Sequence, residues 1–333
     1  MKALRIGLIG AGVMGADHAR ILASGIAGAE LAAVQDADPV RAQAVAGNCG
    51  GRVVAHAEAL IGGPEVDAVL VCSPDETHAP FALACIAAGK PVLVEKPLAS
   101  SPEAALTVVE AETRAGRRLV QVGFMRRFDP GYRAMKAVLA EERFGAALFL
   151  HCVHRNAVGP DYLTSDLVIA NSAVHEIDIA RFLLDEEFVA ATVISPRASR
   201  KAPGRQAQLI VLETASGIVV DVEAFVDAGY GYDVRAELVC ESGTVSLAPN
   251  PPVAVRQSGH DGFAVEQDWR ARFRDAYREQ MADWVGSIRT GVPTGSSAWD
   301  GYAASVTAAA CLEAWRSRAR TPVSLGGRPN LYG

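Results

Sequence analysis

Short apolar runs alternate with longer helical patterns over the first third of the chain. The apolar runs have the length and β-branched content of strands, whereas the segments between them have the length and spacing of helices. Strands separated by helices need crossover connections, which are right-handed and build a parallel sheet. Residues 1–122 are therefore predicted to form a doubly wound α/β domain. The predicted strands are 4–9, 30–34, 68–72, 91–94 and 119–122, and two clear helices are 79–88 and 102–115, the latter capped by Ser101.

The pattern changes after residue 122, where strands with alternating apolar and polar side chains begin to dominate. Such alternation is typical of an antiparallel sheet that packs on one face only. Residues 123–333 are therefore predicted to form an α+β domain with an open, mostly antiparallel sheet. The outward face of this sheet includes Phe225 and Val239, so we expect another subunit to cover part of it. The predicted helices are 131–141, 166–184, 270–290 and 298–318, and the clearest strands are 147–154, 218–226 and 233–241.

Composition excludes several classes of partner and location. A net charge of -6 over 333 residues argues against the phosphate-neutralising surface that nucleic-acid binding needs. No apolar run is long enough to span a membrane, and the glycine-punctuated segment 4–15 is predicted to be a strand and turn rather than a signal peptide. The six cysteines lack CxxC spacing and are interpreted as small buried apolar residues in a reducing compartment. We therefore expect a cytoplasmic protein with no nucleic-acid or membrane partner.

A glycine fingerprint follows the first predicted strand and opens a helix. In that context the glycines permit a tight turn, close approach of the backbone to a pyrophosphate, and helix-to-sheet packing. Asp36 ends the second predicted strand 21 residues after the last glycine, where a carboxylate accepts hydrogen bonds from a ribose and repels a 2'-phosphate. The sequence therefore predicts NAD, rather than NADP, as cofactor. The fingerprint consists of Gly10, Ala11, Gly12, Val13, Met14 and Gly15.

Two further segments are predicted to border the cofactor because they follow the third and fourth of the predicted strands. Ligands of doubly wound sheets bind beyond the carboxyl ends of the strands. Ser73 and Pro74 begin the first segment, which ends at His78; that histidine either contacts the nicotinamide or simply caps and packs its loop. Glu95 and Lys96 begin the second, and a lysine at a strand end is expected to face the crevice.

These motifs together resemble the family of glucose-fructose oxidoreductases, inositol dehydrogenases and rhizopine-catabolism proteins (Gfo/Idh/MocA). The resemblance covers nearly the whole chain, and its later motifs are those of the inositol dehydrogenase branch. It implies Lys96 and His175 as catalytic residues, a cyclic polyol as substrate, a role in inositol catabolism and a homotetramer. It also implies that Arg126, Asn156, Asp178 and Tyr232 surround the polyol. The motifs lie at 10–15, 73–78, 95–97, 121–129, 151–156, 174–178, 230–233, 268–273 and 298–302.

The chemistry of alcohol oxidation agrees with these residue types. A base must take the hydroxyl proton as the hydride leaves, and histidine titrates near neutral pH. If 166–184 is one α-helix, Asn171, His175 and Asp178 share a face at i, i+4 and i+7. Lys96 can hydrogen-bond the same hydroxyl and stabilise developing negative charge. No cluster has the spacing of metal ligands, so no metal is predicted.

One position departs from the family pattern. The family usually has aspartate where this chain has Asn171, and an asparagine can orient His175 without stabilising its positive charge. We therefore expect His175 to be a weaker base, unless Asp178 compensates, and Asn171 to matter for catalysis. The resemblance therefore implies an NAD-dependent dehydrogenase that oxidises a ring hydroxyl of an inositol. A dehydrogenase of an aldopyranose sugar and a non-catalytic NAD sensor stay open as alternatives.

Overall fold

The structure is a computed structural model that describes residues 2–201, 204–248 and 253–333. These residues divide into two compact units. The first comprises 2–125, 275–305 and 326–333, and the second comprises the described residues of 126–274 and 306–325.

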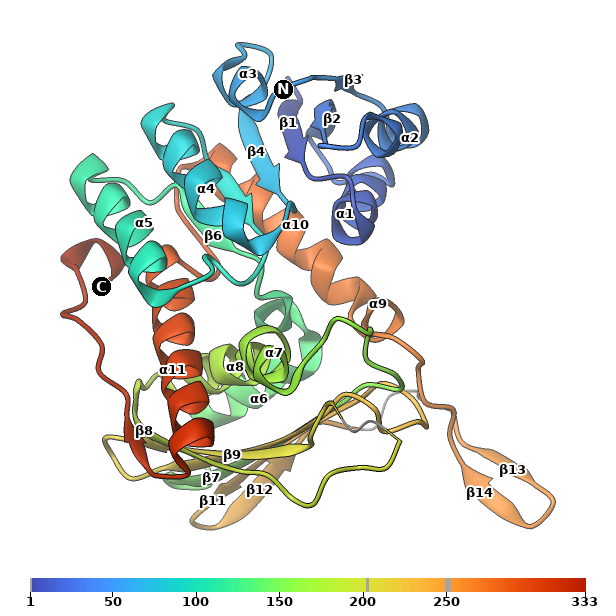
Figure 1. The fold of residues 1–333 in the computed structure, drawn as a ribbon, viewed down its shortest axis with the longest axis vertical. Helices are drawn as coiled ribbons and strands as arrows, with labels where there is room; N and C mark the ends of the chain where they lie inside the picture. The colour runs from blue at the N-terminus through green and yellow to red at the C-terminus, as the bar shows by residue number, and fades with distance from the viewer. Residues whose placement is uncertain (1, 202–203, 249–252) are drawn as a thin grey trace. The chain divides into compact units, whose positions relative to one another are not determined.

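The first unit contains a six-stranded sheet in the order β3-β2-β1-β4-β5-β6, with all neighbouring strands parallel (Figure 1). This order is that of a doubly wound dinucleotide-binding sheet. The five predicted strands are confirmed. The structure adds β3, which could not be predicted because it consists of two exposed residues. The strands are β1 (Leu4–Ile9), β2 (Ala29–Gln35), β3 (Arg52–Val53), β4 (Ala68–Val71), β5 (Val92–Val94) and β6 (Val120–Val122).

Helices connect these strands as the crossover pattern requires. Ser101 caps α5 as predicted, because its hydroxyl accepts a hydrogen bond from the N–H of Ala104 at 3.2 Å. The helices are α1 (Val13–Ala23), α2 (Pro39–Cys49), α3 (Ala57–Gly62), α4 (His78–Ala87) and α5 (Pro102–Ala115), with short 3-10 turns at Asp75–Thr77 and Asn330–Tyr332.

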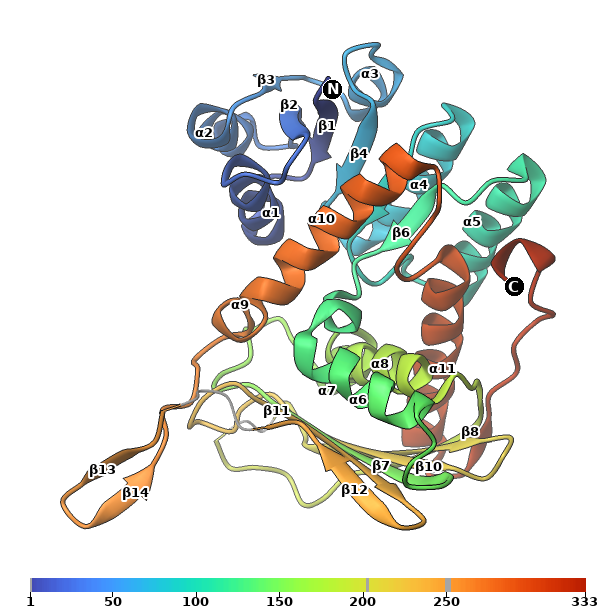
Figure 2. The same cartoon turned by 180° about the vertical axis from the view of Figure 1, so that it is seen from behind.

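The two units are not separated by one boundary after residue 122. The first crossing lies close to it, at Met125, but α10 (Arg274–Thr290) returns almost entirely to the first unit (Figure 2). The reason is apolar burial, since Met281 and Trp284 of this helix join the core that the sheet residues Leu8 and Leu70 build. The chain therefore crosses between the units more than once, and α11 (Ala298–Ser317) begins in the first and ends in the second.

The second unit contains a seven-stranded sheet in the order β12-β11-β7-β10-β9-β8-β15. Only β7 and β10 pair in parallel, so the predicted mostly antiparallel sheet is confirmed. Figures 1 and 2 show α6, α7 and α8 on one face of this sheet. The strands are β7 (Ala147–Arg155), β8 (Phe188–Ile194), β9 (Gln208–Thr214), β10 (Val219–Phe225), β11 (Asp233–Cys240), β12 (Gly243–Ser246) and β15 (Thr321–Pro322). The remaining elements are α6 (Pro130–Ala140), α7 (Ser165–Leu167), α8 (Val174–Leu184), α9 (Trp269–Arg272), a 3-10 turn (Met125–Phe128) and the hairpin of β13 (Val255–Gln257) and β14 (His260–Gly262).

Side chains along the strands alternate between the helix-covered face and an open face. On β7, Leu150, Cys152 and His154 are buried, whereas Phe149 and His151 are exposed. Phe225 and Val239, named from the sequence, are half-buried on β10 and β11. The open face therefore presents apolar area together with charge.

The predicted helix over 166–184 is interrupted. Residues Val168–Ala173 form a π-helical segment between α7 and α8, so an α-helical period does not hold across it. Asn171 lies in this segment, and His175 is the second residue of α8. In the part of the chain that the structure describes, no helix is both long and apolar enough to cross a lipid bilayer.

Candidate functional site

The three glycines of the fingerprint meet three different demands. Gly10 has φ +90°, and a Cβ there would lie 2.5 Å from the backbone of Cys72. A Cβ on Gly15 would lie 1.9 Å from the carbonyl oxygen of Gly10, so the helix can pack this closely only without a side chain. Gly12 faces open space, with nothing within 4 Å of an added Cβ. The backbone at Gly12 is therefore accessible to a ligand.

The N-terminus of α1 provides the donors for that ligand. Gly12 is the N-cap and supplies no side-chain hydrogen bond to the first turn, which Val13 and Met14 begin. Free N–H groups at a helix N-terminus, together with its partial positive charge, bind phosphate. These residues therefore fit a dinucleotide pyrophosphate.

Asp36 lies at the end of β2 and is already bonded to the fingerprint loop. Its Oδ2 accepts a hydrogen bond from the N–H of Ala11 at 2.6 Å, and its Oδ1 accepts one from the N–H of Asp38 at 2.8 Å. An ionised carboxylate has further acceptor positions, so a ribose hydroxyl can still bind it. Its negative charge, reinforced by Asp38, disfavours a 2'-phosphate.

The segment after β4 is held by its own side chains. The hydroxyls of Ser73 and Thr77 lie 2.6 Å apart, and that of Thr77 also donates to the carbonyl of Pro74 at 2.7 Å. His78 is 1% exposed; its Nδ1 lies 2.6 Å from the carbonyl oxygen of Pro97 and its Nε2 lies 2.8 Å from that of Ser73. The protein therefore occupies both ring nitrogens. This geometry favours the packing alternative for His78.

Both carboxylate oxygens of Glu95 are likewise bonded within the protein. Its Oε1 accepts a hydrogen bond from Nε2–H of the buried His18 at 2.7 Å, and its Oε2 accepts one from the N–H of Lys96 at 3.1 Å. Burial alone would raise the pKa of Glu95, but the hydrogen bond and charge of His18, with the charge of Lys96, lower it. The carboxylate is ionised at neutral pH and supports the backbone of Lys96.

A buried charged cluster forms the centre of the candidate site in the second unit. Arg126 and Glu176, each 1% exposed, form an ion pair through NH1 and Oε1. The other carboxylate oxygen of Glu176 lies 2.9 Å from Nδ1 of His154 on β7. Burial alone would raise the pKa of Glu176, but Arg126 and His154 lower it. Arg126, predicted to contact the polyol, is therefore first of all the counterion of Glu176.

Aromatic rings surround this cluster and bring His175 to it. The ring of His175 lies 6.5 Å from that of His154, between centroids, and Tyr232 stands edge-on to His154 at 5.7 Å. The guanidinium of Arg126 lies over the ring of Phe273, 5.3 Å from its centroid. Burial raises the pKa of Tyr232, so its hydroxyl is a hydrogen-bond donor at neutral pH. The structure thus brings His175 and Tyr232 to the buried charged cluster that contains Arg126.

Asp178 has a structural partner. Nε of Arg127 donates to its Oδ2 at 2.9 Å, and NH2 of Arg127 donates to its Oδ1 at 2.6 Å. The side chain of Asp178 is 1% exposed, so this bidentate pair neutralises a buried carboxylate. Arg126 and Arg127 are therefore both ion-pair partners of buried carboxylates.

Asn156 retains a free acceptor. Its backbone is fixed by an N–H bond to Phe225 at 3.1 Å and by a bond from the N–H of Ala228 at 2.9 Å. Its Oδ1 is buried, with no hydrogen-bond partner among the described residues. Buried polar atoms are nearly always satisfied, so a hydroxyl-rich ligand would supply the missing donor.

Sequence reasoning missed His18, His154 and Glu176. A signal for His154 was present, because it occupies the buried register of β7 with Leu150 and Cys152. Glu176 lies within the motif at 174–178, but that motif does not reveal its partners, and nothing local marks His18; the partners lie far away along the chain.

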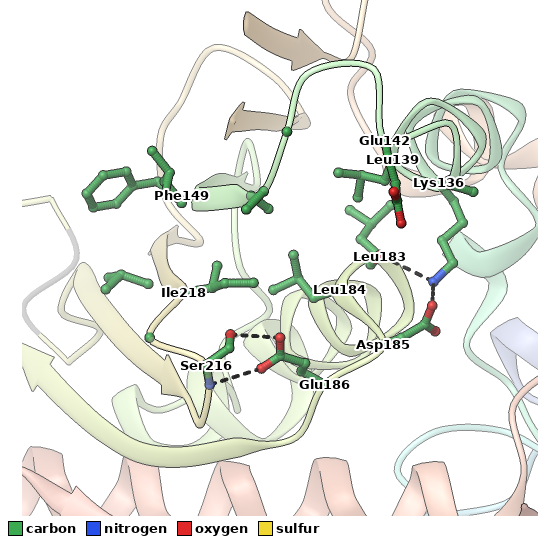
Figure 3. A pocket seen from close by; sticks show the side chains of 17 residues that line it. Lys136, Leu139, Glu142, Phe149, Leu183, Leu184, Asp185, Glu186, Ser216 and Ile218 are labelled. Atoms are coloured by element: carbon green, nitrogen blue, oxygen red, sulfur yellow. Dashed lines mark hydrogen bonds and ion pairs between the residues drawn. The ribbon is translucent and has the colours of Figure 1, made fainter. Parts of the chain in front are cut away.

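A groove of about 810 Å³ in the second unit does not coincide with these residues (Figure 3). Leu139, Phe149, Leu184 and Ile218 line its apolar part, and the ion pair between Lys136 and Asp185 lies at its edge. None of the predicted site residues lines this groove.

Comparisons with known proteins identify close relatives. The chain is 52% identical to "Inositol 2-dehydrogenase 2" of Saccharopolyspora erythraea, covering 99% of this chain and 98% of the relative. It is 44% identical to "Inositol 2-dehydrogenase" of Pseudomonas savastanoi pv. phaseolicola, covering 99% of both chains. Among solved structures, the myo-inositol dehydrogenase of Lactobacillus casei in complex with NAD(H) and myo-inositol matches with a TM-score of 0.96 at 33% identity, covering 99% of this chain and 100% of that one.

The two units also match the parts of one known family. Residues 4–124 match an oxidoreductase family with an NAD-binding Rossmann fold, and residues 132–246 match the Gfo/Idh/MocA C-terminal domain. The first match agrees with the glycine loop and Asp36, and NAD is the cofactor of this protein. The chain belongs to the Gfo/Idh/MocA oxidoreductase family.

Proposed function

We propose that this protein is an NAD-dependent dehydrogenase that oxidises a ring hydroxyl of an inositol to the ketone, an inosose. The observation that carries the proposal is the full-length similarity to relatives named inositol 2-dehydrogenase, at 52% and 51% identity over 99% of this chain. A structural neighbour that holds NAD(H) and myo-inositol supports it. myo-Inositol is accordingly the first substrate to test.

The reaction removes a proton from the hydroxyl and a hydride from its carbon. NAD, when bound, supplies the hydride acceptor. His175 takes the hydroxyl proton as general base, since an imidazole exchanges protons near neutral pH. Lys96 donates a hydrogen bond to the same oxygen and stabilises the negative charge that develops there. Asn171 orients His175 without adding a charge.

The polyol is recognised by donors and acceptors that the second unit holds in a buried setting. Asn156 offers the acceptor Oδ1 that has no partner among the described residues. Tyr232 offers a hydroxyl donor, and Arg126 offers a guanidinium whose position Glu176 fixes. Asp178 contributes through its pair with Arg127. A ring of neighbouring hydroxyls requires this mixture.

Initial rates of NADH formation test the proposal. Purified protein is assayed with myo-, scyllo- and chiro-inositol and with glucose, using NAD or NADP, beside a Lys96→Ala control. Turnover of an inositol with NAD that the control lacks supports the proposal and ranks the isomers. Activity on glucose alone would assign the enzyme to sugars, and tight NAD binding without any turnover would indicate a sensor.

We also propose a cytoplasmic homotetramer that acts in inositol catabolism. The support for assembly is the open face of the sheet, where Phe149, Leu209 and Ile194 are 43%, 36% and 54% exposed. Apolar area of this kind is usually covered by a partner. Light scattering after gel filtration measures the mass, and replacing Phe149 and Ile194 by glutamate is expected to dissociate the assembly.

A further inference from the structure

Glu95 connects two elements of the first unit through one buried carboxylate. Nε2–H of His18, on α1, donates to Oε1 at 2.7 Å, and the N–H of Lys96 donates to Oε2 at 3.1 Å. His18 and Glu95 are 77 positions apart in the sequence. A residue of the helix that opens at the glycine loop is thereby bonded to the residue that precedes Lys96.

The space for this carboxylate is made by a glycine. A Cβ on Gly123, which follows β6, would lie 2.9 Å from Oε2 of Glu95 and 3.1 Å from its Cα. The first contact is closer than real Cβ atoms show, and the second, to the backbone, is tighter than most of them. A side chain at residue 123 would therefore require the carboxylate or the backbone of Glu95 to shift.

The hydrogen bond to Glu95 is the polar contact that fixes the ring of His18. His18 is 1% exposed, and its Nδ1 has no hydrogen-bond partner among the described residues. The ring otherwise packs edge-on against Tyr277, 5.6 Å away between centroids. Apolar residues could fill this space without leaving a nitrogen unsatisfied, so packing alone does not explain a histidine here.

The backbone beyond Lys96 is held as well. Nδ1 of the buried His78 lies 2.6 Å from the carbonyl oxygen of Pro97. Lys96 therefore lies between two contacts, one to its own N–H and one to the carbonyl of the next residue. When the backbone on both sides of Lys96 is fixed, the position from which its side chain extends is fixed as well.

We propose that Glu95 and His18 are positioning residues for Lys96, and that their hydrogen bond ties the position of this lysine to α1, the helix whose N-terminus binds the dinucleotide. The inference rests on the proposed function, in which Lys96 acts on the substrate hydroxyl. Loss of the bond lets the carboxylate turn and releases the N–H of Lys96. Catalysis then falls more than cofactor or substrate binding does, because the lysine acts on charge that develops in the transition state.

Three variants separate this role from packing. His18→Phe keeps a ring against Tyr277 but removes the donor, His18→Gln returns an N–H near the position of Nε2, and Tyr277→Leu disturbs the packing but keeps the donor. We expect His18→Phe to lower kcat about tenfold or more, with KM for inositol and Kd for NAD within about threefold of wild type. His18→Gln should recover most of the rate, and Tyr277→Leu should keep it at equal or lower Tm. Equal losses in all three variants would show packing and overturn the proposal.

A second readout does not depend on inositol turnover. The rate at which acetic anhydride modifies Lys96 is measured by peptide mass spectrometry with NAD present, using Lys136 as the internal reference. We expect this rate to change in His18→Phe and not in Tyr277→Leu. If wild-type protein oxidises no inositol, the proposed function fails, and the labelling still decides the positioning role. Unchanged labelling of Lys96 in His18→Phe would overturn the inference even in an active enzyme.

Discussion

Replacing Glu176 by glutamine is expected to destabilise the second unit strongly. The substitution keeps the size of the side chain and removes the charge that balances Arg126, whose side chain is 1% exposed. It also removes a carboxylate acceptor from His154. Removing one partner of a buried ion pair costs about 3–5 kcal/mol, because the remaining charge stays in a medium of low polarity. The free energy of unfolding should fall by that amount, and Tm by roughly 6–20 °C.

The effect should depend on pH in a defined direction. Although burial by itself raises the pKa of Glu176, Arg126 and His154 lower it below the usual value of 4.5. A carboxyl whose pKa is lower in the folded protein stabilises the fold above its unfolded pKa, and this contribution is lost as pH falls through the folded value. The wild type should therefore exceed Glu176→Gln in stability by the full amount above about pH 5, and the difference should shrink below about pH 4.

Thermal unfolding followed by circular dichroism measures both effects. Asp185→Asn is the matched control, because it removes one carboxylate from the surface pair with Lys136, in which Asp185 is 80% exposed. Pairs of this kind contribute about 0–1 kcal/mol. A double variant, Arg126→Met with Glu176→Leu, leaves no unpaired charge and should be more stable than either single variant. If Glu176→Gln loses no more stability than Asp185→Asn, the reasoning from buried charge is wrong.

Three further predictions follow from other residues. Asp36→Ala should raise the ratio of kcat/KM for NADP to that for NAD about tenfold or more, since the charge that repels a 2'-phosphate is gone; an unchanged ratio in initial-rate assays would contradict this. Asn171→Asp should be faster than wild type, because a carboxylate stabilises positive charge on His175, and a variant no faster at any pH would refute that role. Glu112→Ala should lower Tm, because the buried carboxylate accepts hydrogen bonds from the N–H of Val120 at 2.6 Å and from the hydroxyl of Tyr332 at 2.8 Å. Each buried group left unsatisfied costs about 1–3 kcal/mol, so a Tm equal to that of wild type in a melting experiment would contradict this prediction.

The parallel sheet could be predicted because its strands are buried on both faces. Such strands appear as continuous apolar runs, as in β4, where every residue is buried. The π-helical turn at Val168–Ala173 could not be predicted, since its residues keep an apolar pattern that an α-helix would also satisfy. The return of α10 to the first unit was hidden for a similar reason. Met281 and Trp284 show that the helix has an apolar face, but the sequence does not indicate which core this face joins.

The residues expected to react could be predicted from local motifs, but their neighbours could not. The glycine fingerprint and Asp36 carry a pattern that one type of ligand explains. The partner of Glu176, by contrast, lies 50 positions away, and that of Glu95 lies 77 positions away. Contacts at these separations arise from strand order and helix packing, which a single sequence does not display. For this reason the motifs predict a ligand contact for Arg126 and leave one open for His78, although the protein itself occupies most of their polar atoms.

The two residues proposed to act on the hydroxyl are supported in the same way. Glu95 precedes Lys96, Glu176 follows His175, and both carboxylates are buried. Each carboxylate is bonded to a histidine from another element, His18 in one unit and His154 in the other. Successive residues on a strand or helix point in different directions, so a buried carboxylate can hold the backbone while its neighbour remains available to a ligand. Glu95 also accepts a hydrogen bond from the N–H of Lys96, and Glu176 ties α8 to His154 of β7. We therefore expect substitutions at Glu95 or Glu176 to impair catalysis, although neither side chain is proposed to touch the substrate.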